Sequence, residues 1–201
     1  MWSIAPPSAE KIAVFLNQQR KLDFSYPEVG DSFDRSPAGY EIDHNRVMLG
    51  YGAEVFKQAC EALRTWTMFP KPWTRISPTE APLTKGQVVA MLAHVYGLWW
   101  LNACRIVYTV DEPAPMPRFG FAYGTLPGHV ERGEERFIIE WLPDDTVWYD
   151  LRAFSQPRFW LVRLTKPLAR ALQRRFARES KLAMQRAVIG SVASRDNLRG
   201  N

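Results

Sequence analysis

The second half of the chain most constrains its fold, because long β-rich runs alternate there with short turns. Five runs are rich in β-branched and aromatic residues, and turn-forming residues such as proline, glycine and aspartate separate them. The runs span residues 87–97, 98–110, 118–126, 135–142 and 146–155. Connections this short favour antiparallel neighbours. The pattern therefore predicts a sheet that meanders from strand to strand.

A long amphipathic helix is predicted after the last of these runs. Thr165 is a candidate N-cap, and Pro167 fits the first turn, where its missing N–H is not needed. An apolar stripe recurs at helical spacing, formed by Leu164, Leu168, Leu172, Phe176, Ala183 and Met184. A helix of about 22 residues would be roughly 33 Å long. The polar residues 191–201 are predicted to form a disordered tail.

The first half of the chain predicts two shorter helices. Ser8 precedes an amphipathic run over residues 9–22 and is its expected N-cap. A second apolar stripe begins after Ala53 and ends near Pro70. Proline and glycine interrupt residues 24–52, which are predicted to form a long surface loop with a short strand near residues 40–44. Another short strand is expected around residues 73–76.

This order of elements predicts a single α+β domain over residues 1–190, in which a curved antiparallel sheet grips the C-terminal helix. With 201 residues, 46% of them hydrophobic, the chain can form one sizeable core. Such a grip leaves room for a cavity between sheet and helix. Gly120, Ala122 and Gly124 share one face of their strand, which indicates close packing, a bend in the sheet or space for a ligand.

Several long motifs resemble those of an uncharacterised bacterial and plant family, a UPF-type domain of unknown function. They are GYEIDHNRVMLGYG, FKQACEALRTWTMFPKPW, GLWWLNACRIVY, FGFAYGTLPGHVERGEERF, VWYDLRAFSQPRFWLVRL and QRRFARESKLAMQRAV, and together they cover nearly the whole chain. That family is similar in architecture to the START and Bet v 1-like (SRPBCC) helix-grip proteins. The resemblance implies a fold that holds hydrophobic small molecules between sheet and helix, and it brings no catalytic residues.

Composition excludes several classes of protein. The two cysteines, Cys60 and Cys104, lie far apart without metal-ligand spacing, so neither a disulfide framework nor a zinc site is predicted, and no cofactor is expected. No secretory signal and no apolar run long enough to span a bilayer is present. These features predict a cytoplasmic protein. The sequence leaves its oligomeric state open.

The leading functional hypothesis is binding of a small, largely apolar molecule in the cavity. Polar residues inside apolar strands could orient such a ligand, and aromatic residues could line the pocket. An acidic head group on the ligand would suit Arg105. The alternatives are a solvated sheet face for the polar residues and an ordinary core for the aromatic ones. The candidate ligand-binding residues are Trp100, Asn102, Arg105, Tyr108, Tyr123 and Asp150.

An enzymatic alternative rests on the segment GHVERGEER. His129 with Glu131 or Glu134 could transfer protons in a cyclase-, isomerase- or hydrolase-like reaction. The competing interpretation is a solvated hairpin turn with local ion pairs, which is common at protein surfaces.

A third hypothesis is an interaction module that uses the basic C-terminal helix. The formal net charge of +5 and the arginines of residues 158–186 would attract an acidic partner. No nucleic-acid-binding motif accompanies them, and the cations are scattered around the polar face, which argues against nucleic acid and favours a solvated helix surface.

Overall fold

The computed structural model describes residues 1–157 and 166–199, and the side chains of residues 1–157 and 167–189. Its largest element is an antiparallel sheet with the strand order β2-β8-β7-β6-β5-β4-β3. The strands are β2 (Glu41–Tyr51), β3 (Thr74–Ser77), β4 (Val88–Val95), β5 (Leu98–Glu112), β6 (Arg118–Thr125), β7 (Glu131–Trp141) and β8 (Thr146–Pro157). A short strand β1 (Trp2–Ser3) pairs with β5. The meander predicted from the β-rich runs is confirmed.

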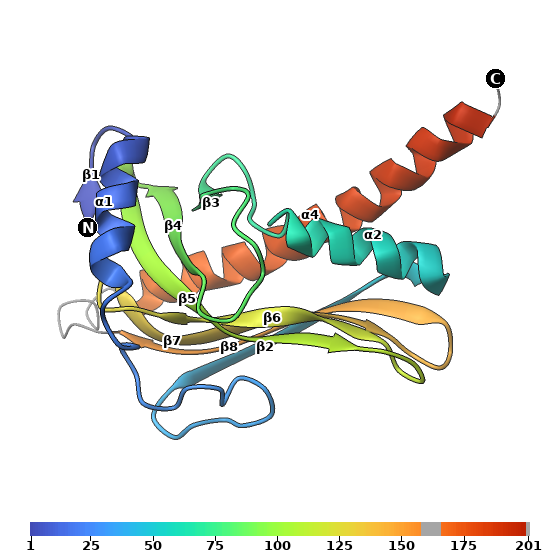
Figure 1. Ribbon diagram of the computed structural model, residues 1–201, viewed down its shortest axis with the longest axis horizontal. Helices are drawn as coiled ribbons and strands as arrows, with labels where there is room; N and C mark the ends of the chain where they lie inside the picture. The colour runs from blue at the N-terminus through green and yellow to red at the C-terminus, as the bar shows by residue number, and fades with distance from the viewer. Residues whose placement is uncertain (158–165, 200–201) are drawn as a thin grey trace.

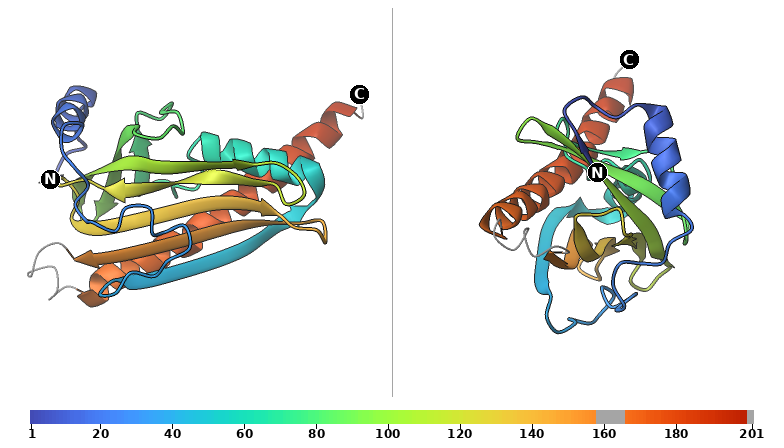
Figure 2. Two further views of the ribbon diagram at one scale, coloured as in Figure 1. Left: turned by 60° about the horizontal axis from the view of Figure 1, so that its bottom comes forward. Right: turned by 90° about the vertical axis from the view of Figure 1, so that its left-hand side faces the viewer.

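The helices lie on both faces of this curved sheet. Helices α2 (Gly52–Arg64) and α4 (Lys166–Arg199) cover one face, while α1 (Ala9–Gln19) and the loop after it cover the opposite face (Figures 1 and 2). We call these the inner and outer faces. The α+β helix-grip class predicted from the sequence is confirmed. The Ser8 side chain accepts a hydrogen bond from the Lys11 N–H at 3.2 Å and caps α1 as expected.

Helix α4 is longer than its apolar stripe predicts. It has 34 residues and reaches Arg199, so it includes most of the segment that composition predicts as a tail. Thr165, the expected N-cap, and Leu164 lie outside the described residues.

The main core lies between the inner face of the sheet and the two helices that cover it. Alternate residues of the central strands point to this side, among them Phe121, Phe137 and Tyr149, which are all fully buried. Met184 and Val188 of α4 pack into the same core. Each such fully buried apolar side chain stabilises the fold by about 1.5–3 kcal/mol.

Strand β2 corrects the prediction of a long loop over residues 24–52. The expected strand near residues 40–44 is in fact eleven residues long and pairs with β8 along its whole length, with a register shift near Gly50. Its residues alternate between polar contacts with α4 and polar contacts on the outer face, so the strand lacks the apolar alternation of a half-buried strand. An edge strand with two polar faces carries little signal in its sequence.

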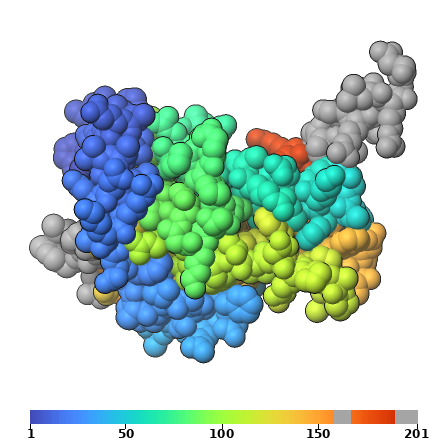
Figure 3. Space-filling view, in the orientation of Figure 1, coloured from blue at the N-terminus to red at the C-terminus, as the bar shows by residue number. Residues whose placement is uncertain are grey.

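The outer face is covered by two N-terminal parts of the chain. Helix α1 contributes Ile12, Phe15 and Leu16 to a second apolar cluster, against β4 and β5. Figure 3 shows α1 along one side of the molecule and the following loop along its lower edge, both in blue. A Cβ at Gly124 would lie 2.0 Å from the Tyr26 hydroxyl, so the small residues of β6 admit the N-terminal loop closely. The sequence left three explanations for these small residues: close packing, a bend in the sheet or space for a ligand. At Gly124 the explanation is close packing, and it occurs on the outer face.

Glu134 of β7 fastens this loop to the sheet. Its carboxylate accepts hydrogen bonds from the Tyr26 hydroxyl at 2.7 Å, the Gly30 N–H at 2.9 Å and the Ser32 N–H at 3.1 Å. The Ser32 hydroxyl donates a further bond. Glu134 is only 3% exposed, so the fold needs these donors to compensate for the loss of hydration.

We expect Glu134→Gln to lower the free energy of unfolding by about 2–3 kcal/mol. The substitution replaces one carboxylate oxygen by an NH₂ group, which cannot accept the hydrogen bonds that the loop donates there. Chemical denaturation measures the effect. The control Glu10→Gln removes the same charge from the exposed first turn of α1 and should lower stability by less than about 1 kcal/mol. Equal stabilities for the two variants would show that the carboxylate does not fasten the loop.

Candidate functional site

A cavity of about 820 Å³ lies between the inner face of the sheet and the first half of α4. Helix α2 packs against α4 and the other end of the sheet, where it fills the space that remains open here. The sheet forms the floor of the cavity. Leu168, Leu172 and Phe176 of α4 line it from the opposite side, and Phe69 and Trp73 add aromatic wall.

One row of residues crosses the floor in register. Asp43 of β2 pairs with Ala153 of β8, which pairs with Glu135 of β7, which pairs with Tyr123 of β6. Cross-strand partners point to the same face of a sheet. All four residues line the cavity. Because Ala153 is small, the floor between the Asp43 and Glu135 carboxylates stays open.

Glu135 has the most perturbed carboxyl group of the cavity. The Tyr123 hydroxyl donates to its carboxylate at 2.6 Å. Burial raises the pKa of Glu135 to about 7, the nearby Glu131 and Asp43 charges add to the rise, and the hydrogen bond from Tyr123 opposes it. Glu135 therefore carries a carboxyl group that is partly protonated near neutral pH.

Glu131 lies on the same face of β7, two strand repeats away from Glu135. Its carboxylate accepts hydrogen bonds from the Gln173 amide of α4 at 3.0 and 3.1 Å. Burial raises the pKa of Glu131, against the effects of Gln173 and Arg170. The glycine between the two glutamates, Gly133, has φ +147° and no room for a Cβ, so no side chain separates them.

Two further polar residues of the cavity accept hydrogen bonds from backbone N–H groups. The His129 imidazole is buried, and its Nδ1 lies 3.0 Å from the Glu131 N–H, which donates to it. Asn102 of β5 accepts a hydrogen bond from the Val130 N–H at 3.3 Å. Trp100 lines the same end of the cavity, and its neighbour Trp99 faces away and stacks on His94.

Helix α4 is held over the floor by contacts to both edges of the sheet. Arg170 forms a bidentate ion pair with Asp43 of β2, with a distance of 2.8 Å between Nη2 and Oδ1. At the other edge, the Trp73 indole donates to Glu179 at 2.6 Å. The ion pair with Asp43 gives Arg170, one of the basic residues of α4, a structural role.

The structure brings together only part of the predicted site. Trp100, Asn102, Tyr123, His129 and Glu131 line the cavity. Their binding of a ligand stays a prediction. Four further candidates point to the outer face: Glu134, Arg105, Tyr108 and Asp150.

Strand geometry explains these four positions. Arg105 follows the alternation of β5 to the outer face, where its guanidinium donates to the backbone carbonyls of Arg20 and Leu22 at 3.0 and 2.8 Å. A register shift between Ile106 and Tyr108 turns Tyr108 to the same side, against Ser32. An acidic head group on a ligand in the cavity would not reach Arg105.

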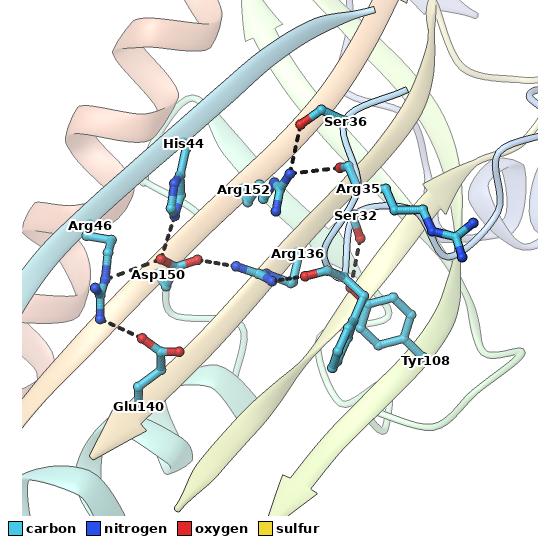
Figure 4. Close-up of polar contacts among 11 residues, drawn as sticks. Ser32, Arg35, Ser36, His44, Arg46, Tyr108, Arg136, Glu140, Asp150 and Arg152 are labelled. Carbon is cyan, nitrogen blue, oxygen red and sulfur yellow. Dashed lines mark hydrogen bonds and ion pairs between the residues drawn. The ribbon is translucent and has the colours of Figure 1, made fainter. Parts of the chain in front are cut away.

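Asp150 is the centre of a charged cluster on the outer face (Figure 4). Its carboxylate accepts from His44 and Arg136, each at 2.6 Å, and lies 3.3 Å from Arg46. Arg136 also donates to the Phe33 carbonyl, and Arg152 donates to the Arg35 carbonyl at 2.8 Å. The cluster thus attaches residues 33–36 to the sheet.

The interpretation of GHVERGEER as a solvated turn is wrong, because β7 begins at Glu131 and its carboxylates are buried or face the cavity. Glu135, Gln173 and Asp43 line the cavity but are not among the candidate site residues predicted from the sequence. A signal was present for Glu135: extending the period-2 alternation of Phe137 backward along the chain places Glu135 on the inner face.

The raised pKa of Glu135 predicts a pH-dependent stability. Between about pH 4.5 and pH 7, the folded protein holds a proton that the unfolded chain releases, so stability falls as pH rises. Glu135→Gln removes this loss. Relative to wild type, the variant should gain about 2 kcal/mol in free energy of unfolding from pH 5 to pH 8. Denaturation at both pH values measures it; a constant difference would contradict an elevated pKa.

The described helices and side chains set two further limits. No helix within residues 1–157 and 166–199 is long and apolar enough to cross a membrane. Across the described side chains, no three histidine, cysteine or acidic residues converge as a metal site would require.

Comparison with solved structures supports the fold. A Thermus thermophilus protein matches with a TM-score of 0.51 and 13% identity, over 75% of this chain and 99% of that one. A hypothetical protein of Helicobacter pylori matches with a TM-score of 0.50 and 12% identity, over 84% and 95% of the two chains. At these identities the likeness concerns the fold alone.

Comparison with curated sequences gives the family. UPF0548 proteins are 32% identical in Dictyostelium discoideum, over 99% of both chains, and 38% identical in Deinococcus radiodurans, over 93% of this chain and 98% of the relative. A third, from Arabidopsis thaliana, is 33% identical over 76% of each chain. The profile described as domain of unknown function DUF1990 matches residues 25–183. The bacterial and plant family suggested by the motifs is thereby confirmed, and the chain belongs to the DUF1990 (UPF0548) family.

Proposed function

We propose that this protein binds a small, largely apolar molecule in the cavity between its sheet and α4. The observation that carries the proposal is the cavity itself, whose volume of about 820 Å³ falls in the range of small-molecule sites. Protein interiors are otherwise close-packed, and an unfilled apolar volume forfeits packing energy. A bound molecule restores these contacts.

The lining of the cavity defines how such a molecule would be held. Aromatic and aliphatic side chains provide most of the wall, among them Phe69, Trp100 and Phe176. A few polar groups converge on the floor, where Tyr123 and Glu135 share a hydrogen bond. An apolar body with one polar end fits this division.

We expect a neutral apolar fluorophore, N-phenyl-1-naphthylamine, to bind saturably, with increased emission. Ala153→Trp should weaken this binding at least about tenfold, because the indole would occupy the open floor beside Glu135. Val14→Trp, on the exposed side of α1, adds the same bulk away from the cavity and should leave binding unchanged. Equal affinities for Ala153→Trp and wild type would contradict binding in the cavity.

Native mass spectrometry of the freshly purified protein tests the same proposal without a chosen probe. A reproducible adduct in the wild type, lost in Ala153→Trp and kept in Val14→Trp, supports a bound cellular molecule. Solvent extraction and mass analysis then give its chemical class.

A second candidate function is proton transfer to a bound molecule, as the enzymatic hypothesis expects. One observation favours it: a carboxyl group with a pKa of about 7 lies on the cavity floor at Glu135, and such a group both donates and accepts protons near neutral pH. Glu135 then takes the place of Glu134, which lies on the outer face. Different molecules extracted from wild type and from Glu135→Gln would support catalysis, and identical molecules would favour binding alone.

A further inference from the structure

The cavity floor has carboxyl groups whose hydrogen-bond partners are neutral. Glu135 accepts from the Tyr123 hydroxyl, and Glu131 accepts from the Gln173 amide. Among the ion pairs of the described residues, none includes either glutamate. A carboxylate in such a place is costly unless an opposite charge joins it.

The other ionisable groups around Glu135 supply little compensation. Asp43 of β2 adds negative charge, and its bidentate partner Arg170 of α4 is already engaged by it. From β6 and the β6–β7 turn come Tyr123 and His129, and His129 accepts from the Glu131 N–H. Three further basic residues line the cavity from α4, farther along the helix than Arg170: Arg174 is exposed, Lys181 donates to Asn45 and Arg178 pairs with Glu179. Arg132 of β7, which also borders the cavity, donates to Gln156.

The electrostatics of the floor therefore oppose the acidic head group suggested by Arg105. An anion there would face Glu131 and Glu135 at close range, while Arg105 lies on the outer face. A cation would instead pair with an uncompensated carboxylate inside an apolar cavity. The aromatic rings of Trp100, Phe69 and Tyr123 around the floor also attract positive charge.

On the basis of the proposed ligand-binding function, we propose that the ligand is an apolar amine whose ammonium group pairs with Glu135. Gly133 leaves the floor open beside this carboxylate, and Glu131 adds to the negative potential. The apolar body of the ligand lies along Phe69, Trp100 and Phe176.

Three probes with one apolar body and different head groups test the charge preference: 4-phenylbutylamine, 4-phenylbutanol and 4-phenylbutanoate. Isothermal titration calorimetry with the full-length protein at pH 8 should show the amine binding about tenfold more tightly than the alcohol, and the carboxylate more weakly than both. Glu135→Gln should bring amine and alcohol to within about twofold of each other, and Glu131→Gln should reduce the preference partly.

Glu10→Gln is the matched control, because it removes one negative charge from an exposed site on α1 and should keep the full preference. The pH profile adds a second readout. The amine stays protonated from pH 6 to pH 8, while Glu135 with its pKa of about 7 ionises, so amine affinity should rise by up to about tenfold. Glu135→Gln should abolish this rise.

The outcomes separate this inference from the function on which it rests. Equal or stronger binding of the alcohol, or an amine preference that survives in Glu135→Gln, would overturn the amine assignment while leaving the cavity a binding site. If none of the three probes binds and N-phenyl-1-naphthylamine fails as well, the proposed function is overturned together with it.

Discussion

The attachment of α4 to both edges of the sheet is the constraint on which the rest of the structure depends. Arg170 binds Asp43 on β2, and Glu179 accepts from Trp73 just before β3, so the helix spans a curved sheet instead of following its surface. Tyr149 adds a contact to Ser180 at 2.8 Å in the middle. Because α2 fills only one end of the space beneath α4, the other end remains a cavity.

The two faces of the sheet divide the polar residues by role. On the outer face, Glu134 and Asp150 each gather several donors, and these contacts fasten the N-terminal loop to the sheet. On the inner face, Glu131 and Glu135 line the cavity, and each accepts hydrogen bonds from one neutral side chain. Buried charges that hold a fold together are compensated within it. Neither inner-face glutamate belongs to an ion pair of the described residues.

A shift of one residue along a strand decides whether a side chain faces the cavity or the outer face of the sheet. Glu134 and Glu135 are neighbours in the chain, yet one fastens a loop and the other faces the cavity, because successive strand residues point to opposite faces. An interpretation of GHVERGEER as a turn leaves this alternation unused, so the residues alone do not distinguish Glu134 on the outer face from Glu135 in the cavity. In β5, one register shift before Tyr108 had the same effect, since it reverses the alternation for all residues after it.

The sequence by itself determined the class of fold, the meander from β3 to β8, the helices α1, α2 and α4, and the family. The class of fold and its elements follow from local periodicity, capping and turn residues, which act over a few positions and leave a readable pattern, whereas the family follows from the resemblance of long motifs. Only the tertiary structure decided which face of the sheet each polar side chain occupies. It also decided the full extent of strand β2 and which residues line the cavity. Those features depend on register and on contacts between residues such as Asp43 and Arg170, which lie far apart in the chain, and no local pattern encodes such pairs.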